Sequence, residues 1–309
     1  MIDSATPDAA RIARIIHSQF PALDPVRVRF LGEGYDSWAY EVNDVLVFRF
    51  PKRADVEKQL LTEARFLETL AASRPPVPVP DFQFHGIPNA EFPRHFGGYT
   101  KLPGRPAIET NPPATDLGHL APSLGRFLSW LHAFPADEAI RLGVPDQRDD
   151  SVLQEARAEA LEGLDVVRQV LPDAPLNEWR RFLETLPSSA TSASFAVVHN
   201  DLAAEHVLVD DSSQSVTGII DWSDAAVGDR AIDFAGIYHW GGAEFLDNVL
   251  TNYDGAVDDG LQARAHYFAA CRGVLDVVFG LARDRREYVS GGLHALAWAV
   301  DPRSLPARR

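Results

Sequence analysis

Four side chains that could accept a proton or bind a cation occur close together in this sequence: His199, Asp201, His206 and Asp221. The apolar run 195–198 predicts a strand that leads into the first two of them. Apolar runs at 206–209 and 216–220, separated by polar turn residues, predict a β-hairpin that ends at the fourth. Strand and hairpin would therefore bring all four side chains to one loop region.

The register of this hairpin decides whether two of the side chains meet. We expect Val209 to pair with Val216 across the turn. His206 would then face Ile219, with Asp221 one diagonal step away on the same face. Such diagonal neighbours lie roughly 7–8 Å apart, so both side chains could reach one cation.

The order of these residues follows the catalytic loop of kinases, H-x-D-L-x-x-x-N and then a metal-binding aspartate, with His206 in place of the asparagine. Asp201 would orient and accept the proton of an attacking hydroxyl. His206 and Asp221 would hold Mg²⁺ against the nucleotide phosphates, although imidazole is a less usual ligand for this ion. We count His199 with the catalytic group and expect it to anchor the loop. The motif predicts phosphoryl transfer; a turn-capping pair on an ordinary loop is the alternative.

A glycine-bearing loop, 32–37, connects two predicted strands near the N-terminus. Glycine lets backbone N–H groups approach a phosphate closely, and Ser37 could add a hydroxyl donor. Gly34 and Ser37 are therefore candidate nucleotide contacts, although many hairpin turns use glycine for their geometry alone. No G-x-x-x-x-G-K-[ST] motif occurs, which excludes a P-loop enzyme.

Arg49 is the candidate for holding the phosphates. Alternation along the strand 45–50 places it on a half-buried face, where a guanidinium needs an anionic partner. Glu63 lies on the apolar stripe of the following helix and is the expected partner. Kinases hold the α- and β-phosphates with a strand lysine paired to a helix glutamate. A purely structural Arg49–Glu63 salt bridge is the alternative, and Lys52 is a rival phosphate contact.

The composition of the 309-residue chain is that of a globular protein, with 46% hydrophobic and 24% charged residues. A net charge of −15 makes nucleic acid and anionic membranes unsuitable partners, because both require a basic surface. A cationic small molecule would be attracted, although acidity can also serve solubility alone. We expect a monomer.

The sequence predicts a cytoplasmic protein. Cys271 is the single cysteine, which rules out an internal disulfide and a cysteine-based zinc site. No uninterrupted apolar stretch reaches about 20 residues, so no transmembrane helix is expected. The N-terminus also lacks the pattern of a signal peptide.

Short strands dominate the first third of the prediction, and helices dominate the remainder. The strands are expected at 26–31, 38–42, 45–50, 82–85 and 98–102, with a helix at 55–72 among them. Proline and glycine at 103–106 mark a hinge. We predict an α+β, bilobal fold. A β-rich N-lobe over 1–102 would join a mainly helical C-lobe over 103–309 that carries the catalytic-loop hairpin.

Acidic residues beyond the hairpin have two interpretations. Asp229 could cap the helix that follows, and Asp229 and Asp233 could both stabilise the catalytic loop. Six other carboxylates could line a site for a cationic substrate, although a solvated surface is the simpler interpretation of each: Asp224, Glu244, Asp247, Asp254, Asp258 and Asp259.

Together these motifs resemble the aminoglycoside phosphotransferase family, which includes macrolide phosphotransferases and other small-molecule kinases. The resemblance is carried by three segments, 199–210, 218–222 and 228–234. It extends to shorter segments at 31–37, 47–51 and 102–104 and covers about residues 26–240. The loop and the aspartate after the hairpin are its most specific part.

The resemblance implies a protein-kinase-like fold with the nucleotide, ATP or GTP, between the lobes. It implies Asp201 as the catalytic aspartate, and His206 and Asp221 as the magnesium ligands. Two positions depart from the common pattern. Histidine replaces asparagine at 206, as in the 2″-aminoglycoside and macrolide branches, and Arg49 replaces the usual nucleotide-binding lysine.

The resemblance also implies how the base and the acceptor would bind. The backbone of Tyr99, Thr100 and Leu102 would meet the base, with Ile220 packed beneath it. The acceptor would lie over the helices of the C-lobe. The acidic charge suits a polycationic aminoglycoside or a macrolide with an amino sugar, whose phosphorylation would confer resistance.

Other functions stay open at this point. Choline-like and other metabolite kinases share the same core. A nucleotide-binding protein that no longer transfers phosphate is suggested by the arginine at position 49. A metal-dependent hydrolase would instead use His199, Asp201, His206 and Asp221 as ligands.

Overall fold

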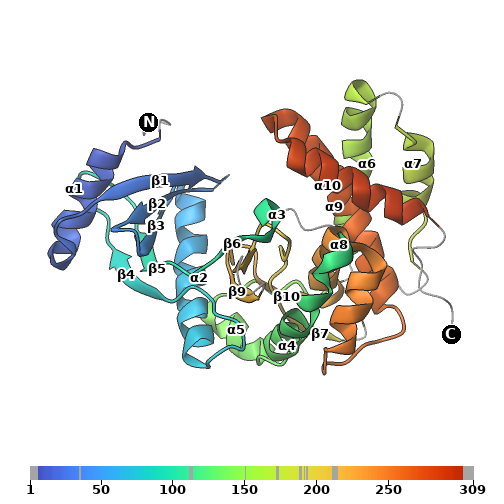
Figure 1. Ribbon diagram of the computed structural model, residues 1–309, viewed down its shortest axis with the longest axis horizontal. Helices are drawn as coiled ribbons and strands as arrows, with labels where there is room; N and C mark the ends of the chain where they lie inside the picture. The colour runs from blue at the N-terminus through green and yellow to red at the C-terminus, as the bar shows by residue number, and fades with distance from the viewer. Residues whose placement is uncertain are drawn as a thin grey trace.

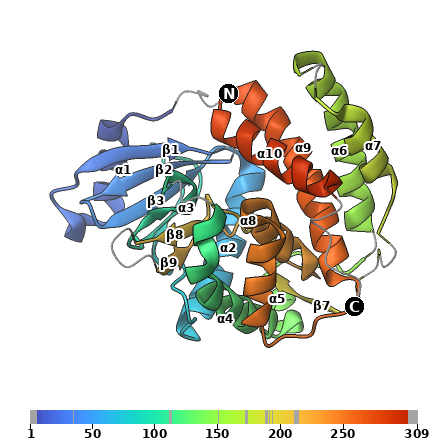
Figure 2. The ribbon, with the colours of Figure 1, turned by 45° about the vertical axis from the view of Figure 1, so that its right-hand side comes forward.

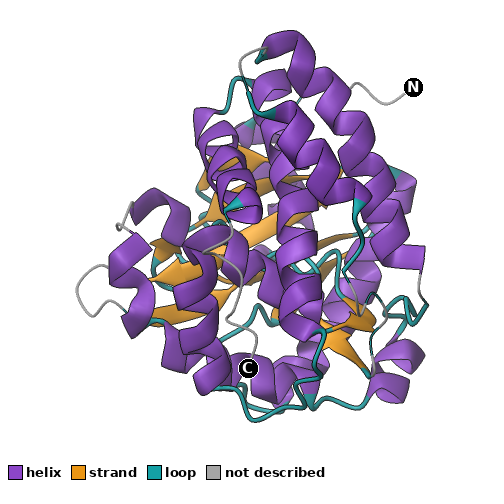
Figure 3. Ribbon diagram, turned by 90° about the vertical axis from the view of Figure 1, so that its right-hand side faces the viewer, coloured by secondary structure: helices purple, strands orange, loops and turns teal. Residues whose placement is uncertain are grey.

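The computed structural model describes residues 6–301, except 35, 111–113, 150, 172–173, 188–189, 191, 193 and 211–214. A β-rich first part is followed by a mainly helical second part (Figure 1). The α+β, two-lobed fold that the sequence predicts is therefore confirmed. In Figure 3 the strands, drawn in orange, lie among the purple helices.

The N-lobe is built on a five-stranded antiparallel sheet of order β1-β2-β3-β5-β4. Its strands are β1 (Val28–Glu33), β2 (Ser37–Val42), β3 (Leu46–Pro51), β4 (Phe82–Gly86) and β5 (Phe96–Thr100). Its helices are α1 (Ala9–Gln19), the short 3₁₀ turn η1 (Pro21–Leu23) and α2 (Ala54–Ala72). All five predicted strands are present, shifted by a few residues at their ends.

The two faces of β3 bury different side chains, as alternation predicts. Phe48 and Phe50 share a core with Ile12 of α1. Val47, which alternates with them, joins the core that contains Leu67 of α2. The face of β3 that carries Arg49 is therefore turned toward α2, which stands between the sheet and the C-lobe in Figure 1.

The chain enters the C-lobe through a tight connection at Gly104. This residue has φ of 93°, and an added Cβ would lie 2.7 Å from the carbonyl oxygen of Val209 and 2.4 Å from Oγ1 of Thr217. Only glycine fits that conformation and that close approach. The lobe boundary at 102/103 stays a prediction.

The C-lobe contains most of the helices and two small antiparallel sheets, β6-β8-β9 and β10-β7. Its helices are α3 (Ala107–Thr110), η2 (Ala114–His119), α4 (Ala121–His132), α5 (Ala136–Leu142), α6 (Ser151–Val170), α7 (Leu176–Glu184), α8 (Ala231–Thr251), α9 (Leu261–Arg283) and α10 (Arg286–Val300). Its strands are β6 (Arg105–Pro106), β7 (Phe195–Val198), β8 (Val207–Val209), β9 (Val216–Ile219) and β10 (Ala226–Asp229). Figure 2 shows α6, α7, α9 and α10 gathered on the side away from the N-lobe sheet.

The predicted hairpin forms, but its register is only partly as expected. Val209 pairs with Val216, which confirms the first expectation. A register shift then inserts one extra residue on β9, so that Val207 pairs with Ile219. The expected pairing of His206 with Ile219 is therefore wrong: the N–H of Ile220 donates to the carbonyl of His206 at 2.9 Å. Turn residues 211–214 lie outside the described part of the chain.

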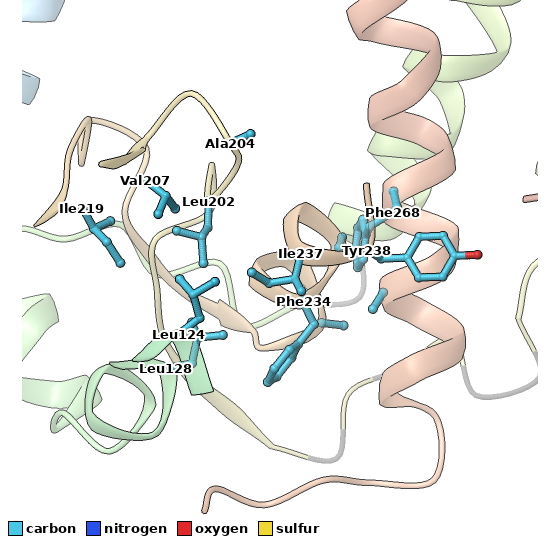
Figure 4. Packing of buried hydrophobic residues seen from close by; sticks show 14 of the residues in the cluster. Leu124, Leu128, Leu202, Ala204, Val207, Ile219, Phe234, Ile237, Tyr238 and Phe268 are labelled. Carbon is cyan, nitrogen blue, oxygen red and sulfur yellow. The ribbon is translucent and has the colours of Figure 1, made fainter. Parts of the chain in front are cut away.

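The hairpin and the catalytic loop are seated on a buried apolar core. Leu202 of the loop, Val207 of β8 and Ile219 of β9 have at most 1% of their surface exposed. Figure 4 shows these residues gathered near Leu124 and Leu128 of α4. This packing fixes the base of the loop.

Among the described residues, one helix has the length and composition that could cross a membrane, although none was expected. It is α9, and 61% of its most apolar window is buried inside the molecule. Helices α6, α8 and α10 pack against it. That burial is the property of a core helix.

Candidate active site

The catalytic loop follows β7 and is held by the fully buried carboxylate of Asp233 in α8. Asp233 accepts hydrogen bonds from the backbone N–H groups of His199 (3.0 Å) and Asn200 (2.9 Å). His132 of α4 lies 3.1 Å from the same carboxylate. Asn200 has a left-handed backbone, with φ of 69°, and its side chain donates to the carbonyl of Asp224 at 3.0 Å. Asp233 therefore stabilises the loop, as expected.

The imidazole of His199 is buried and bonded to the backbone at both nitrogens. Because a carbonyl oxygen only accepts, Nε2 donates to the carbonyl of Ile220, 3.0 Å away. Nδ1 then accepts from the N–H of Asp201 at 3.3 Å. Burial lowers the pKa of His199, which favours this neutral form. These contacts support an anchoring role for His199.

Asp201 carries its carboxylate between two nitrogen-bearing side chains. Oδ1 accepts a hydrogen bond from Nη1 of Arg272 at 2.7 Å. Oδ2 lies 3.5 Å from Nδ1 of His206, and 32% of the side chain is exposed. The carboxylate can therefore reach a bound molecule, as a general base must.

His206 and Asp221 converge even though the predicted register is off by one residue. Nε2 of His206 lies 3.6 Å from Oδ2 of Asp221. Asp221 has φ of 63°, and this left-handed turn after Ile220 brings its carboxylate back toward the imidazole. Nδ1 of His206 donates to the carbonyl of Asp201 at 2.7 Å, so in the neutral ring Nε2 keeps a lone pair for a cation.

This pair fits the donor set of a Mg²⁺ site that is completed by phosphate oxygens and water. Burial opposes charge on His206, but the neighbouring carboxylates of Asp201 and Asp221 outweigh it and raise the pKa of His206. A bound cation would take the place of that proton. Burial likewise opposes ionisation of Asp221, yet Arg49 and His206 hold the pKa of Asp221 below its ordinary value.

A four-ligand hydrolase site does not form. In the part of the chain that the structure describes, no three His, Cys, Asp or Glu side chains are grouped as metal ligands. His199 explains why, because both of its nitrogens are bonded to the backbone.

Arg49 and Glu63 form the predicted ion pair. Nη1 of Arg49 donates to Oε1 of Glu63, and Nη2 lies 3.4 Å from Oδ1 of Asp221. The N–H of Trp222 also donates to Oε1 of Glu63, at 3.3 Å. The guanidinium therefore joins the N-lobe sheet and α2 to the cation-binding aspartate of the C-lobe.

The glycine loop between β1 and β2 is closed by Lys52. Its ammonium donates to the carbonyl of Gly34 and pairs with Glu33, both at 2.6 Å. An added Cβ at Gly34 would meet only the carbonyl oxygen of Ser37 within 4 Å, at 3.7 Å, and the N–H of Gly34 donates to that same oxygen at 3.0 Å. Tyr35 lies outside the described residues. Lys52 is thus engaged in shaping the loop.

The segment expected to meet the base lies at the junction of the lobes. The ring of Tyr99 is buried in the N-lobe, Thr100 is exposed, and Ile220 is half-buried. Leu102 packs onto Gly218, where an added Cβ would lie 2.8 Å from its Cδ1. β5 and the C-lobe hairpin therefore meet at this segment.

A cavity of about 420 Å³ opens beside the catalytic loop, within the range typical of small-molecule pockets. Three carboxylates and three aromatic residues contribute to its lining: Glu205, Asp276, Glu287, Trp240, Tyr288 and Trp298. None of the six acidic residues considered for a substrate site is among its lining residues. The carboxylates that do line it come from a loop, α9 and α10.

Arg272 of α9 is the residue of this site that sequence reasoning missed. Besides Asp201, it binds Glu205, with Nη2 2.9 Å from Oε1. It follows Asp201 by 71 residues, and no motif connects the two. The available signal was an arginine within an apolar helical stretch, since a buried arginine requires an anionic partner.

Residues 27–267 match the family described as "Phosphotransferase enzyme family". The chain belongs to this family. Viomycin phosphotransferase of Streptomyces vinaceus is 32% identical over 126 residues, which is 32% of this chain and 42% of that protein. The uncharacterised protein YcbJ of Bacillus subtilis (strain 168) is 26% identical over 269 residues, 82% of this chain and 83% of that protein.

Solved structures of antibiotic phosphotransferases share the fold over nearly their whole length. The GDP complex of aminoglycoside 2'-phosphotransferase-IIIa is 26% identical, with a TM-score of 0.74 over 95% of this chain and 99% of the other. Macrolide 2'-phosphotransferase type I is 27% identical, with a TM-score of 0.64 over 96% and 99%. The protein is therefore a phosphotransferase with a kinase-like fold that acts on a hydroxyl of a small molecule.

Proposed function

We propose that the protein transfers the γ-phosphoryl group of ATP or GTP to a hydroxyl of a cationic antibiotic, an aminoglycoside or a macrolide, and so confers resistance. The contacts of Asp201 carry this proposal, because its carboxylate lies 3.5 Å from His206 of the His206–Asp221 pair and is joined through Arg272 to Glu205 of the cavity wall. Nucleotide phosphates on one side and acceptor on the other would meet at this carboxylate. The protein would act as a cytoplasmic monomer.

The catalytic residues have three separate roles: accepting the proton, binding the cation and anchoring the loop. Asp201 accepts the hydroxyl proton through the oxygen that Arg272 leaves available, and His199 keeps the loop in shape. His206 and Asp221 would hold Mg²⁺, which would neutralise charge on the phosphates. Phosphoryl transfer depends mainly on such positioning, since the protein itself need form no covalent bond.

The nucleotide would lie between the N-lobe (1–102) and the C-lobe (103–309). Arg49, held by Glu63, would turn its second nitrogen to the phosphates, and the backbone of Gly34 with Ser37 would cover them. The adenine or guanine ring would lie against Leu102 and Ile220. The backbone of Tyr99 and Thr100 would meet the ring's edge.

The acceptor pocket supports a cationic, partly apolar ligand. Glu205, Asp276 and Glu287 supply negative charge, and aromatic walls suit the apolar faces of sugar rings. Related structures include kanamycin and gentamicin complexes of aminoglycoside phosphotransferases. The net charge of −15 would draw such a cation toward the protein.

A transfer assay tests the proposal. The protein is incubated with Mg²⁺ and γ-labelled ATP or GTP against kanamycin, gentamicin, viomycin, a macrolide and choline. We expect label on at least one cationic antibiotic and less on choline. Absence of transfer to every acceptor, together with no thermal stabilisation by nucleotide, would count against it. Stabilisation without transfer would favour a silent nucleotide-binding protein.

The variant Asp201→Ala tests the residue assignment. It should lower the turnover rate by about 10²–10⁴-fold, the range for loss of a general base, without lowering the stabilisation by nucleotide. Asp254→Ala removes an exposed aspartate of the same lobe and is the matched control. Retained activity in Asp201→Ala would mean that another residue acts as the general base.

A further inference from the structure

We propose that Arg272 is a positioning residue for the catalytic aspartate and links it to the acceptor pocket. In this view its guanidinium holds one oxygen of Asp201, so that the other oxygen is presented to the acceptor hydroxyl. The inference rests on the proposed function, since it concerns the same carboxylate and the same cavity.

The guanidinium reaches two carboxylates through its two terminal nitrogens. Nη1 lies 2.7 Å from Oδ1 of Asp201, and Nη2 lies 2.9 Å from Oε1 of Glu205. Both are charge-assisted hydrogen bonds, which are stronger and more directional than neutral ones. With Oδ1 engaged, Oδ2 is the oxygen left for the acceptor.

Two further side chains, Asp276 and His239, lie beside the guanidinium of Arg272. Its Nε lies 3.7 Å from Oδ2 of Asp276, one turn later on α9, and Nε2 of His239 on α8 lies 3.0 Å from the same oxygen. Burial opposes charge on Arg272, but the surrounding carboxylates outweigh it and raise the pKa of Arg272. The guanidinium is therefore a fixed cation, with only 21% of its side chain exposed.

Both of these residues, Asp276 and His239, belong to the cavity wall, as does Glu205. One arginine thus contacts the proton-accepting carboxylate at one end and the wall of the pocket at the other. A ligand that moves Glu205 or Asp276 would therefore act on the orientation of Asp201 through Arg272. The backbone contacts described for the loop fix its main chain, whereas Arg272 binds the carboxylate itself.

The loss of this contact should affect the chemical step more than binding of the nucleotide. In Arg272→Gln the carboxylate of Asp201 is free to rotate, and we expect kcat to fall on the order of 100-fold, as when a reacting group is misplaced by about an ångström. KM for the nucleotide should stay unchanged. Arg272→Lys keeps the charge but not the fork, and should recover part of the lost kcat.

The matched control is Arg264→Gln on the same helix. Arg264 is also a buried arginine that binds two carboxylates, Asp229 and Asp258, which are not among the lining residues of the pocket. It should lower the melting temperature with little change in kcat. A purely structural role for Arg272 predicts the same pattern for both arginines, and that result would overturn the inference.

Crystal structures of the unmodified protein and of Arg272→Gln give a readout that does not depend on an acceptor. We expect the carboxylate of Asp201 to turn away from its original orientation in the variant while the loop backbone stays in place. An unmoved carboxylate would refute the inference even if no acceptor were ever phosphorylated. Failure of the unmodified protein to bind nucleotide or transfer phosphate would instead refute the proposed function.

Discussion

At the scale of single residues, Arg49 is bound by two carboxylates of different accessibility. The side chain of Glu63 is 2% exposed, whereas that of Asp221 is 45% exposed. Arg49 can therefore keep its bond to Glu63 while its second nitrogen exchanges Asp221 for a phosphate. A lysine offers no planar fork and would bind one partner at a time with less geometric control. Arginine at this position is thus compatible with nucleotide binding.

Glu63→Gln tests this division of roles. It leaves Arg49 with one exposed carboxylate, and we expect the free energy of unfolding to fall by about 3 kcal/mol, the lower end for breaking a buried pair. KM for the nucleotide should rise. The control Glu68→Gln alters an exposed glutamate of the same helix, paired with His85, and should change stability by less than about 0.5 kcal/mol. Equal effects of both variants in denaturant titrations would contradict the prediction.

At the scale of elements, α8 determines where the catalytic loop lies. Asp233 binds two backbone N–H groups of the loop. One turn later in α8, the backbone at Gly236 lies directly against the backbone of the loop. A Cβ at position 236 would lie 1.4 Å from the carbonyl oxygen of Leu202. Helix and loop are therefore in direct backbone contact, and the loop cannot keep its place if a side chain intervenes.

Gly236→Ala should displace the loop. We expect a loss of about 3 kcal/mol in stability, the upper end for overpacking a close contact, and a fall in turnover because Asp201 moves with the backbone. Gly118→Ala in η2 is the control, since the nearest atom to its added Cβ is Nδ2 of Asn248 at 3.9 Å, an ordinary contact, and Gly118 is not among the lining residues of the pocket. Thermal denaturation and turnover of the two variants, measured side by side, check the expectation. Similar melting temperatures for both would disprove it.

The hairpin shows how far sequence reasoning reaches for an element. The turn residues and flanking apolar runs were sufficient to pair Val209 with Val216. They did not reveal the register shift that moves the partner of His206 from Ile219 to Ile220. A bulge depends on local backbone geometry and not on the apolar pattern, so periodicity alone misses it.

At the scale of the whole molecule, the local motifs were predictable and the acceptor side was not. Asp201 and its loop neighbours lie within a few residues of one another, and their spacing alone predicts phosphoryl transfer. Arg272, Asp276 and Glu287 of α9 and α10 meet Asp201 and Glu205 of the loop only through the packing of elements that lie far apart in sequence. No periodicity or spacing reports such tertiary contacts.

Carboxylates from both lobes lie near one another at the site, and their effect shows in the pKa of Asp224. Neighbouring atoms that remove part of its hydration, and then repulsion from Asp201, Asp221 and Asp36 of the glycine loop, raise the pKa of Asp224 to about 6, although the residue as a whole stays open to solvent. A carboxyl whose pKa is higher in the folded than in the unfolded state costs stability once it ionises. The penalty is absent below about pH 4, grows as the pH rises, and is complete above about pH 6.

Asp224→Asn should therefore stabilise the ligand-free protein in a pH-dependent way. Because the side chain is exposed to solvent, screening limits the gain to about 1 kcal/mol at about pH 8, and it should vanish near pH 4. Thermal denaturation of both proteins at these two pH values measures the difference. Asp259→Asn removes an exposed charge elsewhere in the C-lobe and controls for net charge alone. A gain of equal size at both pH values would show that Asp224 does not feel the carboxylates gathered from the two lobes.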